Sequence, residues 1–280
     1  MAKKKTGDLA HRCNKCGYTQ ARWLGRCPEC GEWNTFEEVT INQDYSAAER
    51  SIAEKFVKEA HSVPLDAIEA NDAVRLSTGI AEFDRVLGGG AVKRSAILIG
   101  GEPGIGKSTL LLQAASASSS GSVKKVLYVS GEESGGQIRS RADRLNLPLK
   151  NIELLCTCRL EDVERVLNKV NPVFVIIDSI QTMYSADAGA VPGTINQLKL
   201  CAHELVSWVK ERDSVLFLTA HVTKDGNIAG PKVLEHLVDT VISFERTEDD
   251  VRFLRALKNR FGSVDELGIF SMDESGLKAI

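Results

Sequence analysis

The stretch GGEPGIGKST, at residues 100–109, carries the residue types that bind phosphate. It fits the pattern G-x-x-x-x-G-K-[ST], whose fixed positions here are Gly101, Gly106, Lys107 and Ser108. Glycines in such a loop let backbone N–H groups point at phosphate oxygens, and the following helix N-terminus adds a favourable dipole. The lysine reaches the β- and γ-phosphates, and the serine binds Mg²⁺. The sequence therefore predicts a site for ATP and Mg²⁺ formed by Gly101, Glu102, Pro103, Gly104, Ile105, Gly106, Lys107, Ser108 and Thr109.

Two acidic positions supply the groups that hydrolysis needs beyond a phosphate loop. Asp178 ends the apolar run VFVIIDS, 71 residues after Lys107, where a carboxylate can hold the water shell of Mg²⁺. Glu132 and Glu133 follow another apolar run, KVLYVSGEE, where a carboxylate can orient the attacking water. We favour Glu132 as this base, and the alternative is an acidic cluster that only stabilises the start of a helix.

Four of the seven cysteines lie within eighteen residues, at Cys13, Cys16, Cys27 and Cys30. Two Cys-x₂-Cys pairs ten residues apart predict a closed, tetrahedral Cys₄ zinc site, which is structural rather than catalytic. Residues 1–30 are also basic, with seven Lys or Arg and two acidic residues. The arginines among them, Arg12, Arg22 and Arg26, could contact DNA or a protein partner together with Trp23, or form an ordinary solvated surface.

The elements that position these groups follow from alternating apolar and helical runs. Strands are predicted at 95–101, 125–133, 151–156, 173–179, 214–222 and 240–246. Helices are predicted at 107–120, 134–146, 160–170 and 194–212, and antiparallel strands close the chain after residue 249. Such alternation predicts an α/β fold with a mostly parallel sheet. The low-complexity patch AASASSSGS, at 114–122, overlaps the first helix and is interpreted as a loop.

Three regions are expected along the chain: a zinc ribbon at 1–38, a linker with a short helix at 39–72, and an ATPase core at 73–280. The net charge of −3 confines any nucleic-acid surface to local patches. There is no run of 18 apolar residues and no secretory signal, so neither a membrane span nor a membrane partner is expected. An odd number of cysteines without a signal favours a reducing, cytoplasmic location.

Five segments resemble one family of proteins. They are CNKCGYTQARWLGRCPECGEWNTF, STGIAEFDRVLGGG, GEPGIGKST, HVTKDGNIAGPKVLEHLVDTVISFE and KNRFG. Together they resemble the RadA (Sms) family of bacterial, RecA/DnaB-like DNA repair proteins, across almost the whole chain. The resemblance implies a RecA-like ATPase core that assembles into a ring, expected to be hexameric. Members of the family normally continue into a Lon-protease-like domain, and this chain, ending at Ile280, is expected to lack it.

The resemblance also implies a function and partners. We expect an ATP hydrolase that acts as a DNA-dependent motor or helicase in recombinational repair. It would bind single-stranded DNA and branched recombination intermediates, promote branch migration, and work with the RecA recombinase. Two alternatives stay open: an ATPase switch of the clock-protein type, and a zinc-ribbon adaptor that does not act on DNA. Stimulation of ATP hydrolysis by DNA separates these possibilities.

Further residues gain expected roles from the same resemblance. The loops at 183–194 and 223–232 would face a central channel, where Lys224 and Lys232 contact DNA phosphates. The alternative is that both loops are plain solvent loops. His221 would sense the γ-phosphate. Lys258 and Arg260 of KNRFG would reach the ATP of the adjacent subunit and couple hydrolysis to DNA, unless KNRFG is a basic hairpin tip or a DNA-contacting turn.

Overall fold

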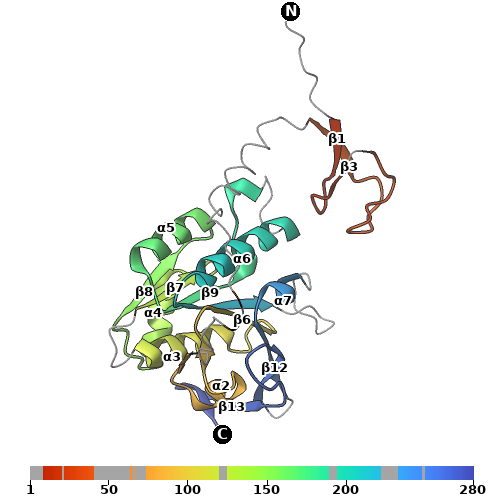
Figure 1. The fold of residues 1–280 in the computed structure, drawn as a ribbon. Coiled ribbons are helices and arrows are strands. Elements are labelled where there is room, and N and C mark those ends of the chain that lie inside the picture. The colour runs from red at the N-terminus through yellow and green to blue at the C-terminus, as the bar shows by residue number, and fades with distance from the viewer. Residues whose placement is uncertain are drawn as a thin grey trace, which may run out of the picture. The chain divides into compact units, whose positions relative to one another are not determined.

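The computed structural model describes residues 9–20, 22–40, 64, 66, 74–119, 125–188, 194–221, 233–247 and 250–280. The chain separates into two compact units, Met1–Asn71 and Asp72–Ile280, and each is described by itself (Figure 1). Most of the predicted linker at 39–72 lies outside the described residues. The predicted boundaries at residues 38 and 72 therefore stay predictions.

The N-terminal unit is a small antiparallel sheet with two cysteine-containing turns. Its strands are β1 (Leu9–Cys13), β2 (Thr19–Gln20) and β3 (Phe36–Thr40), in the order β2-β1-β3. Cys13 at the end of β1 lies opposite Phe36 at the start of β3. The buried apolar cluster of this unit is small. Its four buried members are three cysteines and one phenylalanine: Cys13, Cys16, Cys27 and Phe36.

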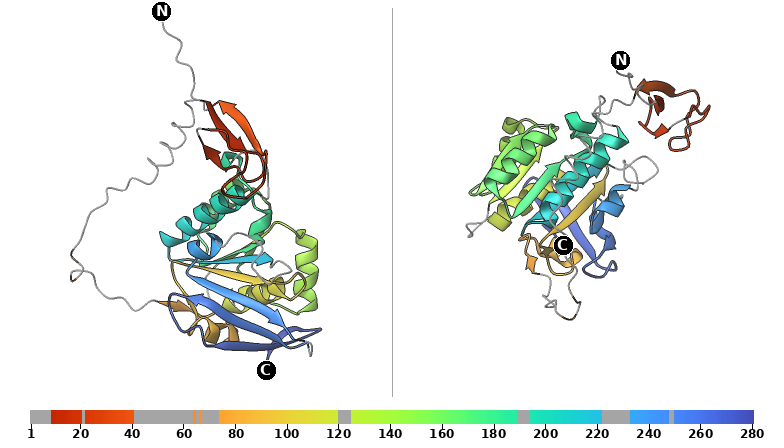
Figure 2. Two further views of the ribbon diagram at one scale, coloured as in Figure 1. Left: turned by 90° about the vertical axis from the view of Figure 1, so that its right-hand side faces the viewer. Right: turned by 45° about the horizontal axis from the view of Figure 1, so that its top comes forward.

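The second unit is built on a nine-stranded sheet with the order β14-β13-β12-β11-β6-β10-β9-β7-β8. The pairs from β11 through β8 are parallel, as predicted, and the pairs from β11 to β14 are antiparallel. Figure 2 shows these C-terminal strands, in blue, extending the sheet at one edge. The strands are β6 (Ser95–Gly101), β7 (Val126–Ser130), β8 (Ile152–Cys156), β9 (Phe174–Asp178), β10 (Val215–His221), β11 (Thr240–Arg246), β12 (Arg252–Asn259), β13 (Leu267–Asp273) and β14 (Gly276–Ala279).

Helices cover both faces of this sheet, which is why its central strands are apolar throughout. On β6, for example, Ile97 and Ile99 belong to one apolar cluster while Ala96 and Leu98 belong to the other. The first cluster includes α2 (Ala81–Val86), α3 (Lys107–Ser119) and α4 (Gly135–Arg144). The second includes α5 (Leu160–Val170), α6 (Ile195–Lys210) and α7 (Val233–Leu237), and short 3₁₀ turns occupy Ile180–Thr182 and Ala186–Ala188.

The expectation of a loop at 114–122 is wrong as far as Ser119, because α3 continues to that residue. Ser118 and Ser119 donate their hydroxyls to carbonyls one turn earlier, at 3.2 and 3.0 Å, so these polar side chains do not break the helix. Ser116 donates to the carbonyl of Pro148 at 2.8 Å. The hydroxyls of these three serines therefore all donate hydrogen bonds to backbone carbonyls, which lets the polar side chains pack on this helix.

The segment STGIAEFDRVLGGG packs against β12, β13 and the C-terminal half of α3. Its α2 is flanked by a two-stranded sheet of β4 (Arg75–Leu76) and β5 (Ala91–Val92). Gly79 has a φ of 77°, and a Cβ atom there would lie 2.4 Å from the Cβ of Ala117, so no larger residue fits. Arg75 donates to the carbonyls of Leu87, Gly90 and Phe261, which joins this segment to KNRFG.

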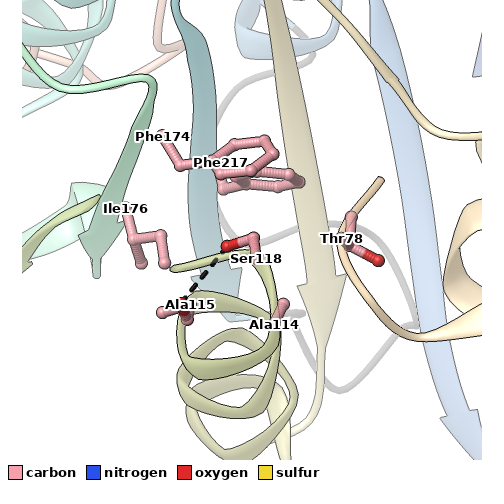
Figure 3. Close-up of a pocket in the computed structure, with 7 residues that line it drawn as sticks. All are labelled: Thr78, Ala114, Ala115, Ser118, Phe174, Ile176 and Phe217. Atoms are coloured by element: carbon pink, nitrogen blue, oxygen red, sulfur yellow. Dashed lines mark hydrogen bonds between the residues drawn. The ribbon is translucent and has the colours of Figure 1, made fainter. Parts of the chain in front are cut away.

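Figure 3 shows a small cavity of about 10 Å³ under α3. Its lining is almost entirely apolar: Thr78, Ala114, Ala115, Ser118, Phe174, Ile176 and Phe217. A space of this size and lining has no room for a ligand and is a packing defect. No helix among the described residues combines the length and the apolar character needed to cross a membrane.

Candidate functional site

The phosphate loop lies between β6 and α3, as predicted. Gly101 ends the strand, where a Cβ atom would lie 2.6 Å from the carbonyl oxygen of Phe244. Gly106 has a φ of 117°, and a Cβ there would lie 2.8 Å from Met272. Gly104 has a φ of 78° and faces open space, with nothing within 4 Å of a Cβ built there. The loop is thus closed on its protein side and open where phosphates would lie.

Lys107, the first residue of α3, points back across this loop. Its ammonium donates to the carbonyls of Gly101 and Glu102 at 2.7 and 2.9 Å and lies 3.4 Å from Nδ1 of His221. Burial lowers the pKa of Lys107 from its usual value, and the charges of Asp178 and Glu132 act in the opposite direction. A desolvated cation of this kind interacts strongly with an anion that enters the loop.

Asp178 ends β9 in the sheet and is buried. Its two carboxylate oxygens accept hydrogen bonds from neighbouring strands: Tyr128 on β7 donates to Oδ2 and Thr219 on β10 donates to Oδ1, both at 2.7 Å. Burial and then the charge of Asp178 raise the pKa of Tyr128 well above its usual value, so this hydroxyl stays a donor. The orientation of the Asp178 carboxylate is therefore fixed by two side chains that sequence reasoning missed.

Glu132 and His221 complete a line of contacts that starts at Lys107. Glu132 Oε1 accepts from the hydroxyl of Ser179 at 2.6 Å and lies 3.3 Å from Nε2 of His221. The backbone N–H of His221 donates to Gln181 at 3.0 Å, which holds the end of β10. The imidazole thus bridges the lysine of the phosphate loop and the carboxylate predicted to orient water.

Glu133 lies in a different environment from Glu132. Its carboxylate forms an ion pair with Arg141 of α4, and its backbone N–H donates to Ser130 at 3.0 Å. The Glu132 side chain is 44% exposed and carries no lysine or arginine partner among the described residues. The two glutamates therefore differ: Glu133 neutralises an arginine, and Glu132 does not.

A second contact that sequence reasoning missed holds the phosphate loop from the C-terminal strands. Arg252, the first residue of β12, is buried and donates through Nε to the carbonyl of Ile105 at 3.0 Å. At the same edge Gln113 of α3 exchanges hydrogen bonds with the backbone of Leu277, at 3.1 and 2.9 Å. The antiparallel strands therefore support the phosphate loop and the helix that follows it.

KNRFG lies at the far end of β12 from Arg252. Lys258 donates to the carbonyls of Glu235 and Val238, at 2.6 and 2.7 Å, and so caps the C-terminal end of α7. Arg260 donates to the carboxylate of Asp239 at 3.2 Å, and its side chain is 55% exposed. Of these two cations, only Arg260 has more than half of its side chain exposed to solvent within a single chain.

The expected DNA contacts fall largely outside the described residues. Lys224 and Lys232 both lie there, as do 189–193 of the first loop. The described part of that loop is anchored, because Ser185 and the backbone of Ala186 bind the carboxylate of Glu161. The predicted DNA contacts of Lys224 and Lys232 stay predictions.

The four N-terminal cysteines come together as the sequence predicts. All four Sγ atoms lie within 4.8 Å of one another. Two of the separations are 3.7 Å (Cys13–Cys30) and 3.5 Å (Cys16–Cys27), and a tetrahedral zinc with Zn–S bonds of about 2.3 Å places its sulfurs about 3.8 Å apart. Gly17 and Gly31 have φ values of 77° and 75°, and each donates its N–H to the first cysteine carbonyl of its turn, at 2.9 Å.

The thiols of this cluster are arranged to share one metal ion. Burial raises the pKa of Cys16 to about 12, whereas for Cys13 the effect of burial is outweighed by hydrogen bonds from Thr35 and the backbone, which lower its pKa to about 6. Thr35 Oγ1 lies 3.1 Å from Cys13 Sγ, where a hydroxyl can donate to a metal-bound thiolate. With four sulfurs and no open position, the cluster fits structural zinc. Trp23 and Trp33 are exposed on this unit, and Arg26 lies 5.8 Å from the Trp33 ring centroid.

The fold and the loop define a P-loop ATPase of the RecA-like α/β class, preceded by a metal-binding ribbon. Comparison with known families agrees: the AAA domain family matches residues 63–227, and the rubredoxin metal binding domain matches residues 11–38. The chain belongs to the AAA domain family. A solved structure with the same fold is the KaiC-like protein PH0186 of Pyrococcus horikoshii OT3, with a TM-score of 0.62, 19% identity, and coverage of 74% of this chain and 99% of that one.

Particular relatives within this class carry one name. The DNA repair protein RadA of Treponema pallidum (strain Nichols) is 68% identical over 280 residues, which is 100% of this chain and 60% of the relative. RadA of Bacillus subtilis (strain 168) is 45% identical over 281 residues, again 100% and 60% of the two chains. RadA of Rickettsia bellii (strain RML369-C) is 47% identical over 268 residues, or 95% and 58%. The resemblance to the RadA family is confirmed, and the chain spans about 60% of the length of these relatives.

Proposed function

We propose that the core hydrolyses ATP with Mg²⁺, and the contact line Lys107–His221–Glu132 beside Asp178 carries this proposal. Lys107 would exchange its two loop carbonyls for the β- and γ-phosphates. Ser108 and Asp178 would hold Mg²⁺, which screens phosphate charge when bound. Glu132 would orient the attacking water, and His221 would transmit the presence of the γ-phosphate to the segment that follows β10.

The same proposal extends to DNA. We infer a DNA-dependent motor, with helicase activity, that binds single-stranded DNA and branched intermediates and promotes branch migration in recombinational repair. Support comes from relatives named DNA repair protein RadA and from the position of His221 directly before the predicted loop at 223–232. A cytoplasmic location, a hexameric ring and cooperation with the RecA recombinase belong to this proposal.

The decisive experiment is ATP turnover with and without single-stranded DNA. Hydrolysis should rise with DNA, should need no particular sequence, and should lose this stimulation as salt increases, because phosphate contacts dominate such binding. Lys107→Ala should abolish turnover in both conditions. An unstimulated but active enzyme would instead favour the ATPase switch. If Lys107→Ala kept full ATP turnover and its stimulation by DNA, the phosphate loop would not be the site of ATP hydrolysis.

The two neighbouring glutamates give a matched control for the base. Glu132→Gln should lower kcat by at least about 100-fold while nucleotide still binds, because a general base contributes about that much. Glu133→Gln should change kcat by only about twofold or threefold, since Glu133 pairs with Arg141. A larger loss in the Glu133 variant than in the Glu132 variant would reverse the assignment.

Arg260 is proposed to act on the nucleotide of an adjacent subunit. A cation supplied from outside the loop stabilises charge on the transferring phosphoryl group. Arg260 has the exposure for this role, whereas Lys258 is engaged with the end of α7. Lys107→Ala chains should be inactive, Arg260→Ala chains should retain only a low rate, and a mixture should recover part of the activity. Mixed rings that form but stay inactive would leave KNRFG as a DNA-contacting turn.

A further inference from the structure

A buried carboxylate lies directly behind KNRFG. Asp239, which precedes β11, is 1% exposed. Its Oδ1 accepts hydrogen bonds from Lys210 at 2.6 Å and from Arg260 at 3.2 Å. Its Oδ2 accepts from Lys210 at 2.5 Å and from the backbone N–H of Ala96 at 3.0 Å. One buried anion thus joins the last residue of α6, the root of the phosphate-loop strand β6, and KNRFG.

The two cations hold Asp239 unequally. Lys210 contacts both oxygens, and its side chain is 40% exposed. Arg260 contacts one oxygen at the longer distance, and its side chain is 55% exposed. A buried carboxylate left without a cation is strongly destabilising. Asp239 without Arg260 would still be neutralised by Lys210 and would still accept from Ala96.

Arg260 also has unused hydrogen-bonding capacity, in contrast to Lys258. A guanidinium carries five N–H donors, and within the described residues the side chain of Arg260 donates one hydrogen bond. The ammonium of Lys258 has two backbone acceptors at 2.6 and 2.7 Å. The two basic residues of KNRFG therefore differ: Lys258 fixes the segment in place, and Arg260 is free to turn.

We propose that Lys210 is a positioning residue for Arg260. By keeping Asp239 neutralised, Lys210 allows the guanidinium to leave this carboxylate and meet a phosphate group. Without Lys210, Arg260 is the one cation among the described residues that still hydrogen-bonds this buried anion, and it is held there. The inference rests on the proposed role of Arg260 toward the nucleotide of an adjacent subunit.

The test compares Lys210→Met with Lys210→Arg in the full chain. Lys210→Met should lower DNA-stimulated kcat about tenfold, toward the rate of Arg260→Ala, while ATP affinity changes less than about twofold and the melting midpoint stays close to that of the parent. Lys210→Arg should restore most of kcat, because a cation returns. Lys93→Met is the matched control, since Lys93 pairs with the exposed Asp213 at 3.1 Å, and it should change neither quantity.

A double variant separates positioning from general damage. Lys210→Met combined with Arg260→Ala should be no slower than Arg260→Ala alone, because both changes remove the same group from the reaction. Full kcat in Lys210→Met, additive losses, or an equal loss of ATP affinity and melting midpoint would each overturn the inference. Full kcat in Arg260→Ala would overturn it together with the role of Arg260, and full kcat in Lys107→Ala would instead remove the proposed ATPase site.

Discussion

The ribbon and the ATPase core differ in what their functional residues contribute to folding. In the ribbon, Cys13, Cys16 and Cys27 are both predicted metal ligands and most of the buried apolar cluster. In the core, Glu132 and Asp178 lie at or just beyond strand ends and Lys107 begins α3, while two large clusters of aliphatic and aromatic side chains cover the sheet on both faces. In the ribbon, the same side chains are therefore expected to bind the metal and to form the buried cluster. In the ATPase core, these two roles fall to different side chains.

Size explains this difference. A segment of about 30 residues cannot bury enough apolar surface to offset its conformational entropy, so it needs a metal or another cross-link. The core, with a nine-stranded sheet and six described α-helices, has enough apolar surface to fold around its own clusters. Its polar groups can then be selected for their chemistry, provided that each buried one finds a partner.

The largest expected effect is loss of the ribbon when a ligand is removed. One zinc ion per chain is expected, and Cys27→Ser should release it and unfold residues 9–40, because metal binding supplies about 10–16 kcal/mol in such sites. The melting transition of the core should stay where it is. Elemental analysis, calorimetry and hydrogen exchange measure these three quantities.

The control for this change is Cys156→Ser, an exposed cysteine of the core. It should leave both the zinc content and the exchange of residues 9–40 unchanged. A ribbon that stays protected from exchange without zinc would break the comparison, since it would then fold on apolar contacts alone. Loss of the core transition in Cys27→Ser would break it from the other side.

A smaller effect is expected where a polar core residue is changed. Tyr128→Phe removes the hydroxyl that donates to Asp178, leaving a buried carboxylate oxygen short of one hydrogen bond. The free energy of unfolding should fall by about 1–3 kcal/mol, and the core should stay folded. The half-saturating Mg²⁺ concentration in ATP hydrolysis should rise several-fold, because the carboxylate loses its fixed orientation.

Phe217→Leu is the matched control for Tyr128→Phe. Phe217 lines the small cavity in Figure 3 and packs against the rings of Phe83 and Phe174. Its replacement should lower stability by about 1–3 kcal/mol without changing the Mg²⁺ dependence. An equal shift in Mg²⁺ dependence for both variants would mean that Tyr128 acts only through packing.

Sequence reasoning predicted the parts of the core that depend on local pattern. The strands and helices are close to their predicted bounds, because buried parallel strands read as short apolar runs and the phosphate loop has a fixed spacing. The cysteine pairs predicted the ribbon for the same reason: their ligands are close in sequence. At the start of α4, Ser134 and Gln137 form a capping box that offsets the helix-weakening effect of Gly135 and Gly136.

What the sequence could not predict are polar contacts between distant segments. Thr219 and Tyr128 meet Asp178 across 41 and 50 residues of sequence, and Arg252 reaches Ile105 across 147. Each is a polar residue in or beside an apolar strand, and that is the available signal. It shows that a partner is required, because buried polar groups are paired, but not which partner. The partners follow from strand order, which only the structure supplies.

The smallest expected effect concerns acid, and it distinguishes the core from the ribbon once more. Asp273 ends β13 and accepts from Lys278 at 2.6 Å and from the hydroxyl and N–H of Ser275 at 2.6 and 2.8 Å. The hydrogen bond from Lys278, and then those from Ser275, lower the pKa of Asp273 from 3.8 to about 2. The β13–β14 hairpin that contains it also binds α3 through Gln113.

The sign of the pH dependence follows from proton binding. Between pH 2 and 3.8 the unfolded chain binds a proton at Asp273 more often than the folded chain does, so the stability from this group is complete above pH 3.8 and is lost as pH falls toward 2. Asp273→Asn should therefore flatten part of the fall in melting temperature across that window and change nothing at pH 7. Because the side chain is exposed, the change should be slight.

Zinc release should begin at higher pH, because protons compete for the thiolates, and should be the same in the parent and in Asp273→Asn. If Asp273→Asn altered zinc release, the hairpin and the ribbon would not respond to acid independently. If the parent and Asp273→Asn lost stability identically from pH 4 to 2, Asp273 would not contribute to the acid sensitivity of the core.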